Sequence, residues 1–280
     1  MSALLAGRPW PLVMGIVNIT PDSFFDGGRH ASTAAAVGHA RRLIEEGADL
    51  IDLGGESTRP GAGPVPPEEE MARVLPVLEA LRNAGVPLSV DTRRPTLMRA
   101  ALAAGAAMIN DVSALREPGA IEAVAGTDAS VCLMHMQGEP RTMQQAPRYG
   151  DVVAEVEPVV RRVADVVLEA RGAACVAAGS GRERILVDPG FGFGKRFEDN
   201  LALARALPRL ARLAPVLVGL SRKSMIGVMT GRTAAADRLA GSVAAALWAA
   251  RQGAAIVRVH DVAATRDALA VWRQFEGEGR

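Results

Sequence analysis

The sequence predicts an α/β fold, a single (β/α)8 barrel of the TIM type, from three observations. Short apolar runs of strand length alternate with longer stretches of helical period, the pattern of a parallel sheet with right-handed crossovers. There are eight such runs, the strand number of this barrel. Asp91, Asn110 and Asp188 each close one run, in PLSVD, AAMIN and RILVD. Polar groups at the exits of buried strands are typical of a barrel mouth.

The expected strands are apolar runs bounded by turn residues. They are Leu12–Val17, Asp49–Leu53, Pro87–Asp91, Ala106–Asn110, Ser130–His135, Arg184–Asp188, Pro215–Gly219 and Ala255–Val259.

The clearest helix begins at Pro66 and Pro67 with an acidic first turn, and its apolar residues from Met71 to Leu81 recur at spacings of three and four. Similar patterns predict further helices in the segments Val37–Ile44, Val152–Leu168, Leu201–Leu210 and Ala234–Ala250. The last is nearly apolar all round, so we expect it to be buried, and a second subunit of a homodimer is one way to cover it.

Length and composition indicate a globular protein with a small partner. The 280 residues suit one barrel as well as two small domains, and no linker composition divides them, so we expect a single domain over residues 1–280. Lys and Arg total 32 against 31 Asp and Glu, so no net field recruits nucleic acid or an anionic membrane. No apolar run is long enough to span a membrane.

Cys132 and Cys175 lie in apolar contexts without CxxC spacing. That pattern argues against a disulfide framework or a thiolate metal site and favours packing residues in a reducing compartment. We therefore expect a cytoplasmic protein.

The connections that leave the strands are longer than those that enter them. Loop 1 (18–28) and loop 2 (54–64) follow the first two strands and are rich in Gly, Pro, Ser and Thr. Long loops in a compact domain are often lids or binding loops. We therefore expect the function at the carboxyl ends of the strands.

Two of these exits offer candidate ligand groups. Asn18 leaves the first strand, where it could cap a turn or supply an amide oxygen to Mg²⁺ held by a substrate phosphate. Loop 2 carries Ser57, Thr58 and Arg59 among glycines. Their hydroxyl and guanidinium donors suit an oxyanion, although polar loops are common for other reasons.

The segment GFGFGK, Gly190 to Lys195, does not match a phosphate loop, because its glycine spacing is wrong and Arg196 stands where Ser or Thr is required. The glycines suit a rigid turn, or one that lets Phe191 and Phe193 lie beside a flat ligand. Only 4% of the chain is aromatic, so two phenylalanines beside a strand-end Asp favour the ligand interpretation.

Basic residues follow the last two strands, where barrels often hold phosphate. Ser221-Arg222-Lys223-Ser224 and Arg258-Val259-His260 form either an anion clamp or a solvated basic rim. We favour the clamp, because Arg258 lies inside an apolar strand and a charge there needs a partner. His135, after Met134, is expected to pack at the mouth, and no His/Glu set has zinc spacing. These groups together suit a flat nitrogen heterocycle carrying a phosphate ester.

Eight segments in order closely resemble the dihydropteroate synthase family of folate biosynthesis, the target of sulfonamides. They are GIVNITPDSFFDGG, DLGGESTRPGA, SVDT, INDVSAL, LMHMQGEPRTMQ, ILVDPGFGFGK, GLSRKSMIG and RVHDV. The resemblance spans about residues 12 to 265, with one segment at each strand exit.

The resemblance implies a transferase that joins 6-hydroxymethyl-7,8-dihydropterin pyrophosphate to 4-aminobenzoate with Mg²⁺, releasing 7,8-dihydropteroate and pyrophosphate. It implies a pterin ring held by Asp91, Asn110, Asp188 and Lys223, in a slot lined by Met134, Phe193 and Gly219. It also implies that pyrophosphate is bound by Arg258, His260 and, through Mg²⁺, Asn18. The aminobenzoate site that it implies is shaped by Phe24, Thr58, Arg59, Pro60 and Ser224. Asp91, Lys223, Arg258 and His260 are the expected catalytic residues.

The departures from the family pattern are DTRRP after the third strand and Ala114 where Gly is frequent; neither touches an expected ligand. Two alternatives remain. A silent pterin-binding paralogue would keep the fold and lose loop residues that this chain retains. A methyltetrahydrofolate–corrinoid methyltransferase would not need the SRKS and STRP segments.

Overall fold

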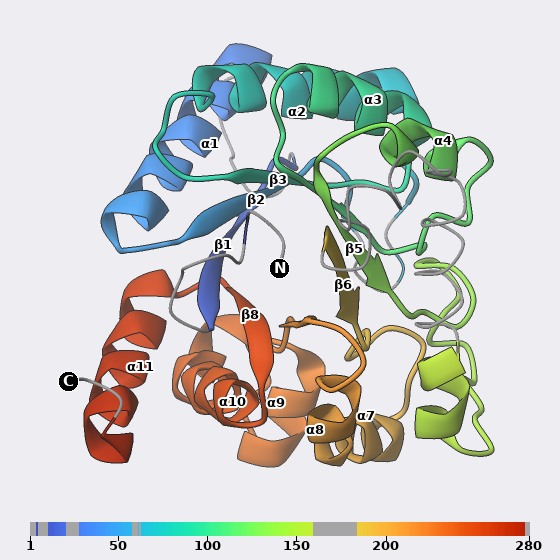
Figure 1. The fold of residues 1–280 in the computed structure, drawn as a ribbon, viewed down its shortest axis with the longest axis vertical. Coiled ribbons are helices and arrows are strands. Elements are labelled where there is room, and N and C mark those ends of the chain that lie inside the picture. Colours follow the sequence, from blue (N-terminus) through green and yellow to red (C-terminus); the bar gives the residue numbers. More distant parts are fainter. Residues whose placement is uncertain are drawn as a thin grey trace, which may run out of the picture.

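A computed structural model describes residues 4, 11–20, 28–57, 61, 63–158 and 184–277, with the backbone alone over 28–32. Eight parallel strands form a closed barrel in sequence order (Figure 1), which confirms the predicted fold class. The strands are β1 (Leu12–Asn18), β2 (Leu50–Gly54), β3 (Leu88–Asp91), β4 (Met108–Asp111), β5 (Ser130–Met134), β6 (Ile185–Asp188), β7 (Val216–Val218) and β8 (Ala254–Val259). Each predicted strand is confirmed.

Helices surround the barrel (Figure 1). They are α1 (Gly28–Glu45), α2 (Pro67–Ala80), α3 (Pro95–Ala103), α4 (Ala120–Ala125), α7 (Phe197–Arg205), α8 (Leu207–Leu210), α9 (Ser224–Thr230), the 3-10 helix η3 (Ala235–Arg238), α10 (Leu239–Arg251) and α11 (Val262–Glu276). Residues 152–158 are also helical.

Two predicted helices are interrupted. The segment 201–210 divides at Ala206 into α7 and α8, because Pro208 has no backbone N–H and fits only the first turn of a helix. The segment 234–250 begins as η3 and becomes α-helical at Leu239. The expectation of all-round burial is wrong for α10 within one chain, since Leu239 is 42% exposed while Ala246 and Ala249 are buried.

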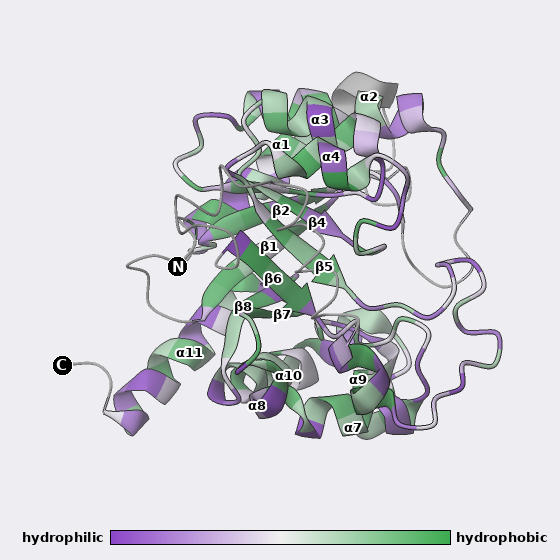
Figure 2. Ribbon diagram, turned by 45° about the vertical axis from the view of Figure 1, so that its right-hand side comes forward, coloured by the Kyte–Doolittle hydropathy of each residue, from purple (hydrophilic) through white to green (hydrophobic). Residues whose placement is uncertain are grey.

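The core has two layers, one between the strands and the helices and one inside the barrel. The inner layer contains Met14, Leu50, Met108 and Cys132. Figure 2 shows these apolar strands at the centre, with polar residues on the outer helices. Cys132 is thus a packing residue, as predicted, whereas Cys175 lies outside the described residues. No described helix is both long and apolar enough to cross a membrane.

The strand register aligns the polar strand ends at one rim. Gly54 pairs with Asp91, and Asp91 pairs with Asn110, so the ends of β2, β3 and β4 lie at the same height. Gly54 also pairs with Asn18 of β1. The rigid barrel therefore gathers side chains that are far apart in the sequence.

Candidate active site

Arg258 is the centre of an ion-pair network at the carboxyl rim. Its Nε donates to Asp52 Oδ2 at 2.6 Å and its Nη2 to Asp91 Oδ2 at 3.0 Å. Asn110 Nδ2 donates to the same Asp52 oxygen at 3.1 Å. The expectation that Arg258 needs a partner is confirmed, and it has two.

Asp52 belongs to this network although the sequence reasoning missed it. It lies within β2 and is fully buried, whereas the predicted site residues were sought at strand ends. The available signal was a charged residue inside the apolar run LIDLG, the same signal that singled out Arg258.

Burial shifts the pKa values of the ionisable groups at this rim. It raises the pKa of Asp91 above its usual value, against the opposing field of Arg258 that favours the carboxylate. It lowers the pKa of Lys223 to about 8, against the opposing field of Asp188. It also raises the pKa of Asp188, while Lys223 acts in the other direction. Such mutually coupled groups are typical of a functional site.

Asp188 and Lys223 meet at the turn that follows β6. Asp188 Oδ1 accepts a bond from the Gly190 amide at 2.7 Å, so one oxygen of this carboxylate caps the turn. Lys223 Nζ donates to the Phe191 carbonyl and lies 4.7 Å from the Phe193 ring centroid. A Cβ at Gly219 would lie 3.9 Å from Lys223 Nζ, so Gly219 is next to this cation.

The two phenylalanines of this turn have different environments. Phe193 packs against an apolar group at the rim that contains Met134, Met136 and Met143, so Met134 and Phe193 come together as expected. Phe191 is fully buried in the main core, so the expectation that it lies beside a ligand is wrong. A bulky apolar side chain in a tight turn gains more from the core than from a partly polar rim.

The basic segments after β7 and β8 are joined to each other. Arg222 makes a bidentate pair with Asp261, at 3.1 Å from Nε to Oδ2 and 2.6 Å from Nη2 to Oδ1. His260 donates its amide to Ser221 Oγ at 3.2 Å, and its Nδ1 lies 3.0 Å from the same oxygen. Arg222 is therefore paired with Asp261, and its place in the anion clamp stays a prediction. Ser224 begins α9 with an exposed side chain.

Asn18 ends β1 beside Gly54 and close to the ion-pair network. A Cβ at Gly54 would lie 3.9 Å from Asn18 Oδ1 and 3.7 Å from Asp91 Cβ. Among the described residues no group of three His, Cys, Asp or Glu side chains could hold a metal ion. A single amide oxygen fits Mg²⁺ that takes its other ligands from phosphate and water.

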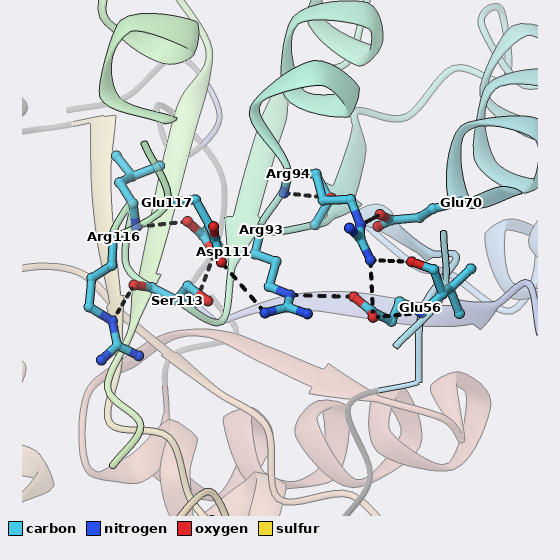
Figure 3. Close-up of polar contacts among 11 residues, drawn as sticks. Glu56, Glu70, Arg93, Arg94, Asp111, Ser113, Arg116 and Glu117 are labelled. Carbon is cyan, nitrogen blue, oxygen red and sulfur yellow. Dashed lines mark hydrogen bonds and ion pairs between the residues drawn. The ribbon is translucent and has the colours of Figure 1, made fainter. Parts of the chain in front are cut away.

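Four predicted residues, Phe24, Thr58, Arg59 and Pro60, lie outside the described residues. The base of loop 2 is described and is held by a second charged network, drawn in Figure 3. Glu56 Oε1 accepts from the Val65 amide at 3.1 Å and from Arg94 Nη2 at 3.3 Å.

Arg94 also joins this network to α2, since its Nε lies 2.6 Å from Oε2 of the buried Glu70. Arg93 bridges Glu56 and Glu117 at 3.5 Å each. Arg94 therefore contacts residues on both sides of loop 2, Glu56 and Val65, and Arg93 adds an ion pair to Glu56.

The turn after β4 explains the preference for glycine at position 114. Ala114 and Leu115 have φ values of 51° and 56°, a region that favours glycine. Asp111 is fully buried and accepts the Ser113 and Leu115 amides at 2.7 Å each (Figure 3). These two bonds hold the turn in its left-handed conformation.

Comparison with known proteins places this barrel among pterin enzymes. Residues 14–260 match the family model described as pterin binding enzyme. The chain is 55% identical to the dihydropteroate synthase of Neisseria meningitidis serogroup B, covering 95% of this chain and 93% of that protein.

Three solved structures are similar over most of the chain. The Xanthomonas albilineans dihydropteroate synthase with 4-aminobenzoic acid has a TM-score of 0.87 and 56% identity, covering 95% and 93% of the two chains. The same enzyme with 7,8-dihydropteroate has a TM-score of 0.84 and 54% identity, covering 95% and 93%. A Yersinia pestis dihydropteroate synthase in a sulfonamide complex has a TM-score of 0.85 and 46% identity, covering 95% and 94%.

Proposed function

This chain belongs to the dihydropteroate synthases of the pterin-binding enzyme family, and from that premise we propose how the residues at its barrel mouth perform the reaction. The enzyme is a transferase that condenses 6-hydroxymethyl-7,8-dihydropterin pyrophosphate with 4-aminobenzoate to give 7,8-dihydropteroate and pyrophosphate. The observation that carries the proposal is the joint network of Asp91, Asn110 and Arg258 at one rim, with Asp188 and Lys223 at the neighbouring turn.

The pterin ring binds through its hydrogen-bonding edges. Asp188 has one oxygen on the Gly190 amide and its second carboxylate oxygen accepts from the 2-amino and N3–H edge. Asp91 and Asn110 form hydrogen bonds with the other ring nitrogens, and Lys223 donates to the ring carbonyl. Met134 and Phe193 contact the faces of the ring, and Gly219, next to Lys223 and Arg258, lies beside it.

The pyrophosphate binds to Arg258 and His260, at the end of β8. Asn18 would contribute its side-chain oxygen to Mg²⁺, which would supply further positive charge beside the pyrophosphate. The C–O bond at the exocyclic methylene breaks, and the electron pair leaves with pyrophosphate. Arg258 and His260 stabilise that leaving charge, while the Asp91 carboxylate stabilises the positive charge that develops on the ring.

The amine of 4-aminobenzoate then attacks the methylene carbon, and its proton passes to the released pyrophosphate. Phe24, Thr58, Arg59, Pro60 and Ser224 shape its site, a proposal that rests on their match to the family segments. Loops 1 and 2 exclude water that would otherwise trap the cationic pterin. A sulfonamide occupies the same site in this proposal, which the sulfonamide complex of the Yersinia pestis relative supports.

The chain acts as a single cytoplasmic barrel domain over residues 1–280 and as a homodimer. Support for the dimer is an apolar surface on two neighbouring helices, where Val228, Met229 and Leu239 are 65%, 51% and 42% exposed. Light scattering on Val228→Glu tests this: a monomer is the expected result, and an unchanged mass contradicts it.

The decisive experiment mixes the protein with both substrates and measures pyrophosphate release. Release that requires both substrates is expected. A silent pterin-binding paralogue releases none, and a corrinoid methyltransferase consumes methyltetrahydrofolate instead. Repeating the assay with Asn18→Ala across a magnesium titration tests the metal proposal, because the variant should need a higher magnesium concentration.

A further inference from the structure

Lys195 is a buried lysine that follows the turn 190–194. Burial lowers its pKa to about 7, but three acceptors around its Nζ favour the ammonium form. Its side chain is only 3% exposed, and its Nζ donates to three backbone carbonyl oxygens, those of His135 at 3.0 Å, Gly190 at 3.0 Å and Phe193 at 2.9 Å. These acceptors use all three donors of an ammonium group. An ammonium without such bonds would cost several kcal/mol to bury.

The three carbonyls converge because two backbone segments approach each other without intervening side chains. A Cβ at Gly190 would lie 1.9 Å from the His135 oxygen, and a Cβ at Gly194 would lie 2.5 Å from the Gln137 oxygen. The turn 190–194 therefore packs backbone to backbone against the segment after β5. Carbonyl dipoles that point at one spot repel each other, and the Lys195 ammonium turns this repulsion into attraction.

Pterin-site groups are attached to this same turn. The Gly190 amide bonds Asp188, and the Phe191 carbonyl receives Lys223 Nζ. The Phe193 ring lies under the same ammonium of Lys223. A shift of the turn therefore moves the Asp188 carboxylate, the Lys223 ammonium and the Phe193 ring together.

Other anchors hold the outer side of the turn. Asn200 Oδ1 accepts the Gly192 amide at 2.7 Å, Gln144 Nε2 donates to the Gly192 carbonyl at 2.7 Å, and Tyr149 donates to the Gly194 carbonyl at 2.8 Å. Lys195 differs from these three neutral anchors, because it bridges the turn to His135 at the β5 exit and also places a positive charge near Asp188. That charge favours the ionised carboxylate.

We propose that Lys195 is a positioning residue of the pterin site, an internal cation that fixes the turn 190–194 against the β5 exit and so aligns Asp188, Phe193 and Lys223 with the ring. This inference rests on the proposed pterin site. Lys195 touches no substrate and acts through these three residues.

The test uses two substitutions that differ in what they leave behind. Lys195→Ala leaves a space lined by three carbonyls, whereas Lys195→Met fills it with a chain that has no donor. Both variants should bind a phosphate-free pterin about ten- to a hundredfold more weakly, the loss expected for misplaced charge-assisted bonds. At saturating pterin the KM for 4-aminobenzoate should stay near that of the unmodified enzyme.

Chemical rescue identifies the ammonium as the cause. Ethylammonium chloride should restore pterin affinity to Lys195→Ala but not to Lys195→Met, and tetramethylammonium chloride at equal ionic strength should restore neither. The matched control is Arg196→Met, which removes the adjacent exposed cation and should leave pterin affinity unchanged. If Lys195→Met does not fold, Lys195→Gln takes its place in the same measurement.

Three outcomes overturn the inference: unchanged pterin affinity in a folded variant, a lowered Tm with normal affinity, or a loss that ethylammonium does not reverse in Lys195→Ala. Asp188→Asn, measured in parallel, separates this failure from a wrong pterin site. If Asp188→Asn also binds pterin normally, the site itself is misassigned. If only Asp188→Asn loses affinity, the site stands and the role of Lys195 is refuted.

Discussion

Arg258 and Asp91 form an ion pair across the rim, with 3.0 Å between Nη2 and Oδ2, while the Nε of the same guanidinium lies 2.6 Å from Asp52 Oδ2. One cation thus compensates two carboxylates, of which Asp52 is fully buried. The guanidinium links the pyrophosphate side of the proposed site to its pterin side.

The first prediction concerns Arg258→Met. Because this substitution leaves the Asp52 carboxylate buried without a cation, the free energy of unfolding should fall by about 3–5 kcal/mol. Pyrophosphate affinity should fall, and pterin affinity should fall with it, since Asp91 loses its partner. Urea unfolding and calorimetry with each ligand measure these effects.

The double variant Asp52→Asn/Arg258→Met is the control for that prediction. Neutralising the buried acid should recover most of the stability but none of the pyrophosphate affinity. A single variant as stable as the unmodified protein would contradict the ion-pair account.

The second prediction concerns Asp188→Asn. The Gly190 amide binds Oδ1 at 2.7 Å, so the new amide keeps its oxygen there and turns its NH₂ group toward the pterin donors. Flipping the amide would sacrifice the Gly190 bond instead. Either way at least one bond is lost, and pterin affinity should fall by roughly 1–3 kcal/mol, or about ten- to a hundredfold. Unchanged affinity with a lower Tm would leave Asp188 as a turn cap only.

The third prediction concerns the pH dependence of stability through Asp111. Burial raises its pKa from 3.8 to about 6, opposed by the Ser113 and Leu115 amides. Between these two pKa values the native state keeps a proton that the unfolded chain has lost. The contribution of Asp111 to the free energy of unfolding is therefore complete below pH 4 and disappears as the pH rises through 6. The shift corresponds to about 3 kcal/mol.

Asp111→Asn removes this titration. The stability of the unmodified protein relative to Asp111→Asn should decline between pH 4 and pH 6 and then remain level. Urea unfolding at intervals of pH measures the difference, and two parallel curves would refute the prediction.

The strands and their polar exits could be predicted from sequence because a buried parallel strand is a compact apolar run whose end is marked by its first polar residue. Asp91, Asn110 and Asp188 were found in this way. Asp52 could not be predicted in the same way, because it lies within its strand rather than at the end of the apolar run. Its partner Arg258 in β8 is 206 residues away, and only closure of the barrel brings the two together.

Short helices and side-chain direction were less predictable. Helices α3, α4 and α9 contain nine, six and seven residues, too few for a helical period to stand out. The longer α11 was also not predicted, although its 15 residues have an amphipathic pattern. Phe191 and Phe193 look equivalent in GFGFGK, and the fold buries one and leaves the other at the rim, which composition alone does not determine.

The last prediction compares the two neighbouring arginines of the loop 2 network (Figure 3). Arg94 Nε lies 2.6 Å from Oε2 of Glu70, whose side chain is only 1% exposed, whereas Arg93 reaches Glu56 and Glu117 at 3.5 Å nearer the surface. Arg94→Met should therefore destabilise the fold by about 3–5 kcal/mol by leaving a buried acid unpaired. The same substitution at Arg93 should cost about 1 kcal/mol or less.

The double variant Glu70→Gln/Arg94→Met tests the cause of that difference, because a neutral amide at position 70 no longer needs a cation. It should regain much of the stability that Arg94→Met loses, even though Glu56 still lacks its Arg94 bond. Thermal unfolding of the three variants and the parent gives the comparison. If Arg93→Met and Arg94→Met lose equal stability, or if Glu70→Gln recovers nothing, the buried Glu70–Arg94 pair does not anchor loop 2, and the contacts of Glu56 with Val65 and Arg93 hold its base instead.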